Sequence, residues 1–156
     1  ATPVTVTGIT TATTIATGTL FSCARLANGT VKCWGSNACA QLRDGTTTSS
    51  ATPVTVTGIT TATDIAAGGA HTCAVRSDAR VRCWGLGTSG QLGNSHNSTS
   101  TAPVPATGLT GATTVAGGNN HTCARRSDQT LWCWGDNNWG QLASNPGWTP
   151  VEALVS

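Results

Sequence analysis

The sequence consists of one unit of 50 residues that occurs three times, and this repeat limits the folds open to the chain of 156 residues. Residues 1–13 read ATPVTVTGITTAT, residues 51–63 read the same, and residues 101–113 read TAPVPATGLTGAT. The spacing holds through each unit, so the tryptophans Trp34, Trp84 and Trp134 fall at one repeat position. Repeats of this length are typical of proteins built from stacked supersecondary units.

Each unit is predicted to contain short strands and no helix. The second unit has strand-like residues at 53–57, 64–67, 71–76 and 80–84, and a loop rich in Gly, Asn, Ser and Thr follows over 85–99. No segment of helical length shows a period of 3.6 residues. Four short strands in a unit of this size are typical of one β-propeller blade, so we predict an all-β fold made of propeller blades.

The repeat divides the chain into blades at 1–50, 51–100 and 101–148, which together form one domain. Residues 149–156 resemble the first strand of a fourth unit, because Thr149-Pro150-Val151 matches Thr52-Pro53-Val54. Propellers typically have about four to eight blades, so three blades and one strand do not close a ring. Three alternatives remain: a fragment of a larger propeller, a ring closed by a second copy, or a filament in which strand 150–155 joins the next subunit.

The cysteines are placed for a disulfide inside each blade. If Leu26 and Thr30 close the hairpin turn that contains Gly29, Cys23 faces Cys33 as a non-hydrogen-bonded pair with Cα atoms about 4.5 Å apart. That distance lies within the disulfide range. The repeat predicts the same pairing in the other two blades, so the full set of disulfide cysteines is Cys23, Cys33, Cys73, Cys83, Cys123 and Cys133.

Two other interpretations of the cysteines remain open, reduced core thiols and a metal site. The ten-residue spacing does not favour metal, because zinc sites use closer pairs. Disulfides would indicate an oxidising compartment, so we expect a secreted or cell-surface protein. Cys39 has no counterpart in the repeat and is expected to be an unpaired thiol, either a tolerated free thiol or half of an intermolecular disulfide.

Composition and motifs argue against several functions. Only 9% of residues are charged and the net charge is +2, with no basic run, so nucleic acid is not an expected partner. No apolar stretch of about 18 residues is present to span a membrane, and no signal peptide is visible. No catalytic, phosphate-binding or metal motif occurs, so we expect no catalytic residues, no metal and no cofactor.

Several residues are candidates for contacts with a partner. Trp132, Trp139 and Trp148 do not recur in the repeat and are candidate binding residues, although simple packing of the last blade is the favoured alternative. His71 and His121 share one repeat position, and we expect a structural role for both. Asn28, Asn97 and Asn120 begin Asn-x-Ser/Thr sequences and are candidate glycosylation sites.

Residues 69–85 and 90–93, with a matching stretch at 118–142, resemble the regulator of chromosome condensation repeat family. The paired cysteines resemble the extracellular bacterial branch of that family. The resemblance covers the whole chain and implies a β-propeller, usually of seven blades with four strands each. Phe21 and Ala40 depart from the pattern in the first unit. The nucleotide-exchange activity of the founding member depends on a site outside the repeat, and it is not expected here.

These observations favour a secreted, non-catalytic binding scaffold whose loops at 36–40, 86–90 and 136–140 contact a partner. The partner would be a protein, a glycan or further copies of the chain. The alternative is a structural subunit of an extracellular assembly or fibre that is built by end-to-end pairing of blades.

Overall fold

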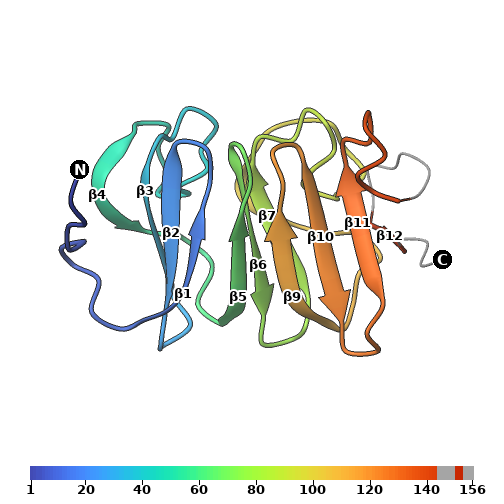
Figure 1. Ribbon diagram of the computed structural model, residues 1–156, viewed down its shortest axis with the longest axis horizontal. Helices are drawn as coiled ribbons and strands as arrows, with labels where there is room; N and C mark the ends of the chain where they lie inside the picture. Colours follow the sequence, from blue (N-terminus) through green and yellow to red (C-terminus); the bar gives the residue numbers. More distant parts are fainter. Residues whose placement is uncertain (144–149, 153–156) are drawn as a thin grey trace.

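The computed structural model describes residues 1–143 and 150–152, which form three four-stranded antiparallel sheets that follow one another in chain order (Figure 1). The first sheet contains β1 (Ala12–Thr17), β2 (Phe21–Leu26), β3 (Val31–Gly35) and β4 (Ser50–Thr55). The second contains β5 (Ala62–Ala67), β6 (His71–Arg76), β7 (Val81–Gly85) and β8 (Ser100–Pro105). The third contains β9 (Ala112–Gly117), β10 (His121–Arg126), β11 (Leu131–Gly135) and β12 (Val151–Glu152).

The sheets are offset from the sequence repeat, because each takes its fourth strand from the start of the following unit. In the first sheet, β4 pairs with β3 through Cys33 opposite Val54. Residues 1–6, the first copy of this segment, have no preceding sheet and form no strand. The second unit does contain four strands, β4 to β7, but β4 belongs to the preceding sheet, so the strands of one unit do not form one sheet. The division at residues 50, 100 and 148 stays a prediction about domain boundaries.

The last described strand completes the third sheet of its own chain. Val151 lies opposite Cys133, and Glu152 lies opposite Trp132. One of the three alternatives had this segment join the blade of the next subunit, whereas residues 150–152 pair here within their own chain. The repeat explains the result, because β12 occupies the same edge of its sheet that β4 and β8 occupy in theirs.

Each blade is cross-linked at the centre of its second hairpin. Cys23 lies opposite Cys33 with their Cα atoms 4.1 Å apart, and the predicted closing bond from the Leu26 amide to the Thr30 carbonyl is present at 2.9 Å. The second and third blades have the equivalent disulfides, Cys73–Cys83 and Cys123–Cys133. The hairpin register read from the sequence thus places all three disulfides.

The turn of this hairpin requires a left-handed residue in every blade. Gly29 occupies the position with φ 80°, whereas Ala79 and Gln129 occupy it with φ 58° and 72°. A residue with a Cβ atom is strained in this region, so the second and third turns cost conformational energy that the first does not.

Neighbouring blades are joined by a repeated polar contact inside an apolar core. The Trp84 Nε1 donates to the Gln41 carbonyl at 2.9 Å, and the Thr72 hydroxyl donates to the same carbonyl at 3.0 Å. Trp134 and Thr122 make the same two bonds to the Gln91 carbonyl, each at 2.9 Å. Each tryptophan is fully buried, and its polar atom is satisfied by the preceding blade.

The turns between the first two strands of each blade also contact one another. The Thr19 amide donates to the Gly69 carbonyl at 3.4 Å, and the Gly69 amide donates to the Asn119 carbonyl at 3.0 Å. A Cβ atom on Gly69 would lie 2.8 Å from that Asn119 oxygen. Glycine is therefore required where these backbones approach each other.

Both end blades expose a face that is buried elsewhere in the chain. Ile15 in the first blade is 73% exposed, whereas its equivalents Ile65 and Val115 are 4% and 8% exposed. Leu131 in the third blade is 44% exposed, whereas the equivalent valines in the other two blades are buried. The core therefore lies between blades, and the two outer faces of the described chain have no partner.

Candidate functional site

The loops that follow the third strand of each sheet gather at one edge of the blades beside the first turns. The Ser36 amide donates to the Leu20 carbonyl at 2.8 Å, and the same bond recurs from Leu86 to Ala70 and from Asp136 to Asn120 at 2.9 Å. We call this surface the loop face. It comprises turns 18–20, 68–70 and 118–120 and loops 36–40, 86–90 and 136–140.

A cavity of about 310 Å³ opens on the loop face where all three blades meet. Its size lies at the lower end of the range for ligand sites. The side chains that line it are mainly small and uncharged, and Leu20 is 72% exposed. The lining residues are Thr19, Leu20, Ser36, Ala38, Cys39, Gln41, Gly69, Ala70, Leu86, Asn119 and Asn120.

A glutamine of the repeat fixes the backbone of each loop, and an asparagine adds a second bond in the first and third loops. The Gln41 Oε1 accepts a hydrogen bond from the Cys39 amide at 2.8 Å, and the Leu42 amide donates to the Asn37 Oδ1 at 2.9 Å. The Asn37 Nδ2 also donates to the Thr46 carbonyl at 3.0 Å. Because Asn37 and Gln41 are buried, the loop is rigid while its tip, residues 38 and 39, is free to vary.

The two candidate binding tryptophans that the structure describes, Trp132 and Trp139, lie toward opposite ends of β11. Trp139 is 92% exposed in the third loop of the loop face. Trp132 lies near the start of β11, at the other end of that strand, where its Nε1 donates to the Thr130 hydroxyl at 3.2 Å and Arg126 lies 5.5 Å from its ring centre. Trp148 lies outside the described residues.

His71 is buried between the second and third blades and occupies a fixed tautomer. Its Nε2 lies 2.8 Å from the Thr122 hydroxyl oxygen, which already donates its proton to the Gln91 carbonyl. The His71 Nε2 must therefore carry a proton and donate it, which leaves the Nδ1 unprotonated and without a partner. Burial, with a smaller effect from His121, lowers the pKa of His71 to about 4 from its ordinary value of 6.5.

The remaining candidate residues lie at the surface or within the loops. Cys39 is a half-buried free thiol in the wall of the loop-face cavity. Asn28 and Asn97 are exposed, and Asn120 is half-buried in the same cavity wall as Cys39. The Asn28 Oδ1 accepts hydrogen bonds from the Thr30 amide and hydroxyl. Glycosylation at these sites stays a prediction.

The sequence predicts the loops of the loop face as contact loops, but it does not predict that they form a cavity with the turns. The available signal was Leu20, a large apolar residue at a turn position that holds Ala70 and Asn120 in the other units. In residues 1–143 and 150–152, no cluster of three or more His, Cys, Asp or Glu side chains is placed to hold a metal ion. The same residues contain no helix that could cross a membrane.

The family assignment is decided by the sequence profile described as "Regulator of chromosome condensation (RCC1) repeat". One such profile matches residues 12–41, 62–91 and 112–141, and a second matches residues 28–75 and 78–125. The chain belongs to the RCC1 repeat family. Each match of the first profile runs from the first strand of a sheet to the glutamine of its loop. The three sheets are therefore blades of an RCC1-type β-propeller, and the described chain does not close the ring.

Solved structures share this fold over most of the chain. Prp20p from Saccharomyces cerevisiae is 25% identical, covers 93% of this chain and has a TM-score of 0.77. Human WBSCR16 is 19% identical, covers 90% of the chain and has the same TM-score. The ectodomain of the Physcomitrella patens receptor kinase CR4 is 28% identical and covers 80%, with a TM-score of 0.53.

The chain spans only part of each of these proteins. It corresponds to 37% of the chain of Prp20p, 37% of WBSCR16 and 29% of the CR4 ectodomain. Yeast RCC1 (Prp20) has been crystallised with Kap60 bound, and Prp20p is described as binding Gsp1p and histones. Among curated protein sequences, none is similar enough to match this chain.

Proposed function

We propose that the chain is a non-catalytic interaction module that binds its partner through the loop face. The observation that carries the proposal is the cavity bounded by all three blades, with exposed Leu20 in its wall and exposed Trp139 on the same face. Tryptophan is one of the residues that most often dominate protein binding, and Leu20 adds apolar surface beside it. The bonds to Asn37 and Gln41 hold the first loop in place, and the bond to the glutamine recurs in the other two loops.

A protein is the partner class that we favour. The loop face presents apolar and amide side chains without a cluster of charge, so it has no feature that would favour a polyanion such as nucleic acid. The yeast relative binds proteins, according to the descriptions of its structures. An exposed Leu and an exposed Trp can fill shallow pockets on such a partner, and a glycan stays the second choice.

We also propose that the module works outside the cell or at its surface. Three disulfides link the hairpins, and such bonds persist in oxidising compartments and are rare in the cytosol. In the chain-entropy model each one stabilises its blade by about 2.5–3 kcal/mol, because it closes a short loop in the unfolded chain.

A peptide library displayed on phage tests the loop-face proposal. We expect selected peptides to bind the purified chain and to lose binding to the Leu20→Ser and Trp139→Ser variants. Leu131→Ser is the matched control, because Leu131 is an exposed apolar residue that lies on β11 outside the loop face. Peptides that bind the loop-face variants as well as they bind the original chain would contradict the proposal.

The second candidate function is a structural subunit assembled end to end. The observation that favours it is the pair of exposed blade faces, one at Ile15 and the other at Leu131, whose equivalents are buried between blades. Sedimentation velocity distinguishes the two functions. Assembly predicts large species that disappear in the Ile15→Lys variant, whereas a single species at all concentrations would exclude it.

A further inference from the structure

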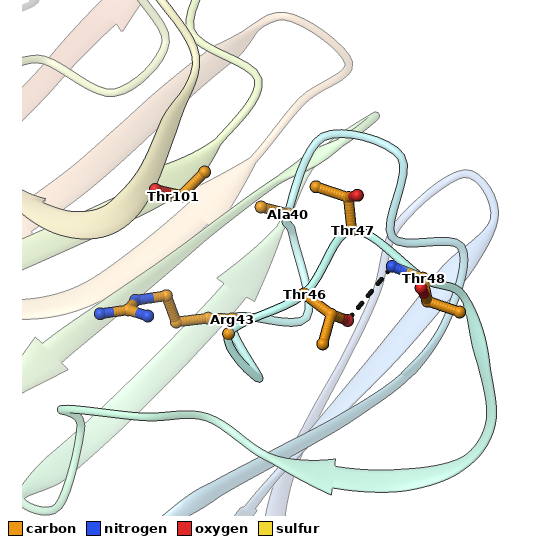
Figure 2. A pocket seen from close by; sticks show the side chains of 7 residues that line it. Ala40, Arg43, Thr46, Thr47, Thr48 and Thr101 are labelled. Atoms are coloured by element: carbon orange, nitrogen blue, oxygen red, sulfur yellow. Dashed lines mark hydrogen bonds between the residues drawn. The ribbon is translucent and has the colours of Figure 1, made fainter.

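A second cavity lies between the first two blades and shares no lining residue with the loop-face cavity. Its volume is about 520 Å³, within the range of small-molecule sites. Its wall comes from the long loop after β3 and from β8, and it consists of Ala40, Arg43, Gly45, Thr46, Thr47, Thr48 and Thr101. Figure 2 shows the Arg43 side chain extending away from Thr46 toward the side on which Thr101 lies.

Arg43 is the charged group of this cavity, and its charge has no acidic partner. Among the described residues it forms no ion pair, and its buried Nε has no hydrogen-bond partner. The neighbouring Asp44 forms no ion pair with it, and the Asp44 Oδ1 instead accepts hydrogen bonds from the Thr46 amide at 3.0 Å and the Asn37 Nδ2 at 3.2 Å. No carboxylate lines the cavity. A ligand with a negative charge would therefore complete it.

The other polar groups of the wall are threonine hydroxyls. The Thr46 hydroxyl is occupied, since it donates to Asp44 at 2.9 Å and accepts from the Thr48 amide at 3.1 Å, the second of which Figure 2 shows. The hydroxyls of Thr47, Thr48 and Thr101 have no hydrogen-bond partner among the described residues. Each hydroxyl can both donate and accept, which suits a ligand that itself carries hydroxyl groups. No large apolar side chain is among the lining residues, so an apolar ligand is not favoured.

The repeat shows that this composition is not needed for folding. The positions of Arg43 in the other units hold Gly93 and Ala143, and Thr46 and Thr47 are replaced by His96 and Asn97. Arg43 also adopts a left-handed backbone with φ 53°, which Gly93 adopts without strain. Ala143 adopts the same left-handed backbone with φ 50°, so the strain alone does not indicate a ligand. The observation that does is the buried Nε of Arg43, which has no hydrogen-bond partner.

We propose that this cavity binds a sugar that carries a carboxylate, with the carboxylate on the Arg43 guanidinium and the sugar hydroxyls on Thr47, Thr48 and Thr101. The planar guanidinium matches the two oxygens of a carboxylate. The site does not depend on the loop-face proposal, and either can fail without the other.

Isothermal titration calorimetry with glucuronate as the probe tests the site. We expect glucuronate to bind at least roughly tenfold more tightly than glucose, which lacks the charge, and than acetate, which lacks the ring. Arg43→Gly should weaken glucuronate binding at least roughly tenfold while its Tm stays equal or rises, because Gly93 shows that glycine suits this backbone. Arg80→Ala, which removes an exposed arginine elsewhere, should leave binding unchanged.

Three results would overturn the proposal. Acetate binding as tightly as glucuronate would show a simple anion site, and glucose binding as tightly would show that Arg43 contributes nothing. Unchanged glucuronate binding by Arg43→Gly would place the ligand elsewhere. The variant Thr101→Ala tests whether β8 contributes to the site together with the loop after β3. We expect it to lower the affinity for glucuronate more than the affinity for acetate.

Discussion

Replacement of His71 by phenylalanine should remove most of the acid sensitivity of this protein. The native protein holds His71 neutral between two blades, where its pKa is about 4, whereas the unfolded chain titrates near 6.5. Between these pH values the unfolded state binds the proton and the native state does not. Stability therefore falls as the pH falls through this window, and the loss is complete below about pH 4.

The size of the effect follows from the difference between the two pKa values. Each pKa unit corresponds to about 1.4 kcal/mol, so about 2.5 units give a loss of about 3 kcal/mol in the free energy of unfolding. Phenylalanine is the residue that the first unit has at this position, Phe21, and it is buried there. The Thr122 hydroxyl keeps its acceptor in His71→Phe, since it donates to the Gln91 carbonyl.

Urea unfolding followed by tryptophan fluorescence, with the disulfides intact, measures this effect at several pH values between 7.5 and 4. We expect the original chain to lose about 3 kcal/mol more than His71→Phe over this range. His96→Ala is the control, because His96 is exposed, and it should behave as the original chain does. An equal decline in the original chain and His71→Phe would refute the reasoning, because it would show that burial of a neutral His71 is not the source of the acid sensitivity.

Three further predictions concern the stability of the blades and of the contact between them. Trp134→Phe should lower the free energy of unfolding by about 1–3 kcal/mol, because it leaves the buried Gln91 carbonyl with one donor fewer. Trp34→Phe should lower it by less, since Trp34 has no preceding blade in the described chain. Chemical denaturation measures both variants, and equal losses would contradict the role of Trp134 between blades. Replacing Cys123 and Cys133 together by serine should lower the free energy of unfolding by about 2.5–3 kcal/mol in the same assay. A loss near zero would show that the conformations of the unfolded chain are already restricted without the disulfide. Gln129→Gly should raise the free energy of unfolding by about 0.5–1 kcal/mol and with it the Tm, because Gln129 adopts φ 72°, which glycine adopts without strain. Calorimetry that shows no increase in Tm would mean that this turn carries no strain.

The fold could be predicted from the sequence because the repeat and the hairpin register are local properties. Alternation along the strands places Cys23 opposite Cys33 once the turn at Gly29 is known, and the structure has this register. The offset between sheet and repeat could not be predicted in the same way. Whether residues 51–56 pair with the preceding or the following strands depends on long-range contacts. The 50-residue repeat shows which residues are equivalent but does not specify which strands pair.

The site was predictable only in part. Loop 36–40 was recognised as variable, and the structure places it on the loop face. The cavity itself needs turns from three different blades, and their approach depends on bonds such as that from Gly69 to Asn119. Arg43 was not singled out in the sequence, because its isolation from acidic groups becomes visible only when Asp44 is seen bonded to Thr46 and Asn37.

Cys39 offers the most direct test of the central claim, that the loop face is the binding surface. Its free thiol lines the loop-face cavity, so a bulky maleimide attached there should fill the cavity. We predict that the labelled chain loses affinity for peptides selected on the unlabelled chain, while a Cys39→Ser variant treated with the same reagent keeps it. Peptides that bind the labelled and unlabelled chains equally would contradict the account.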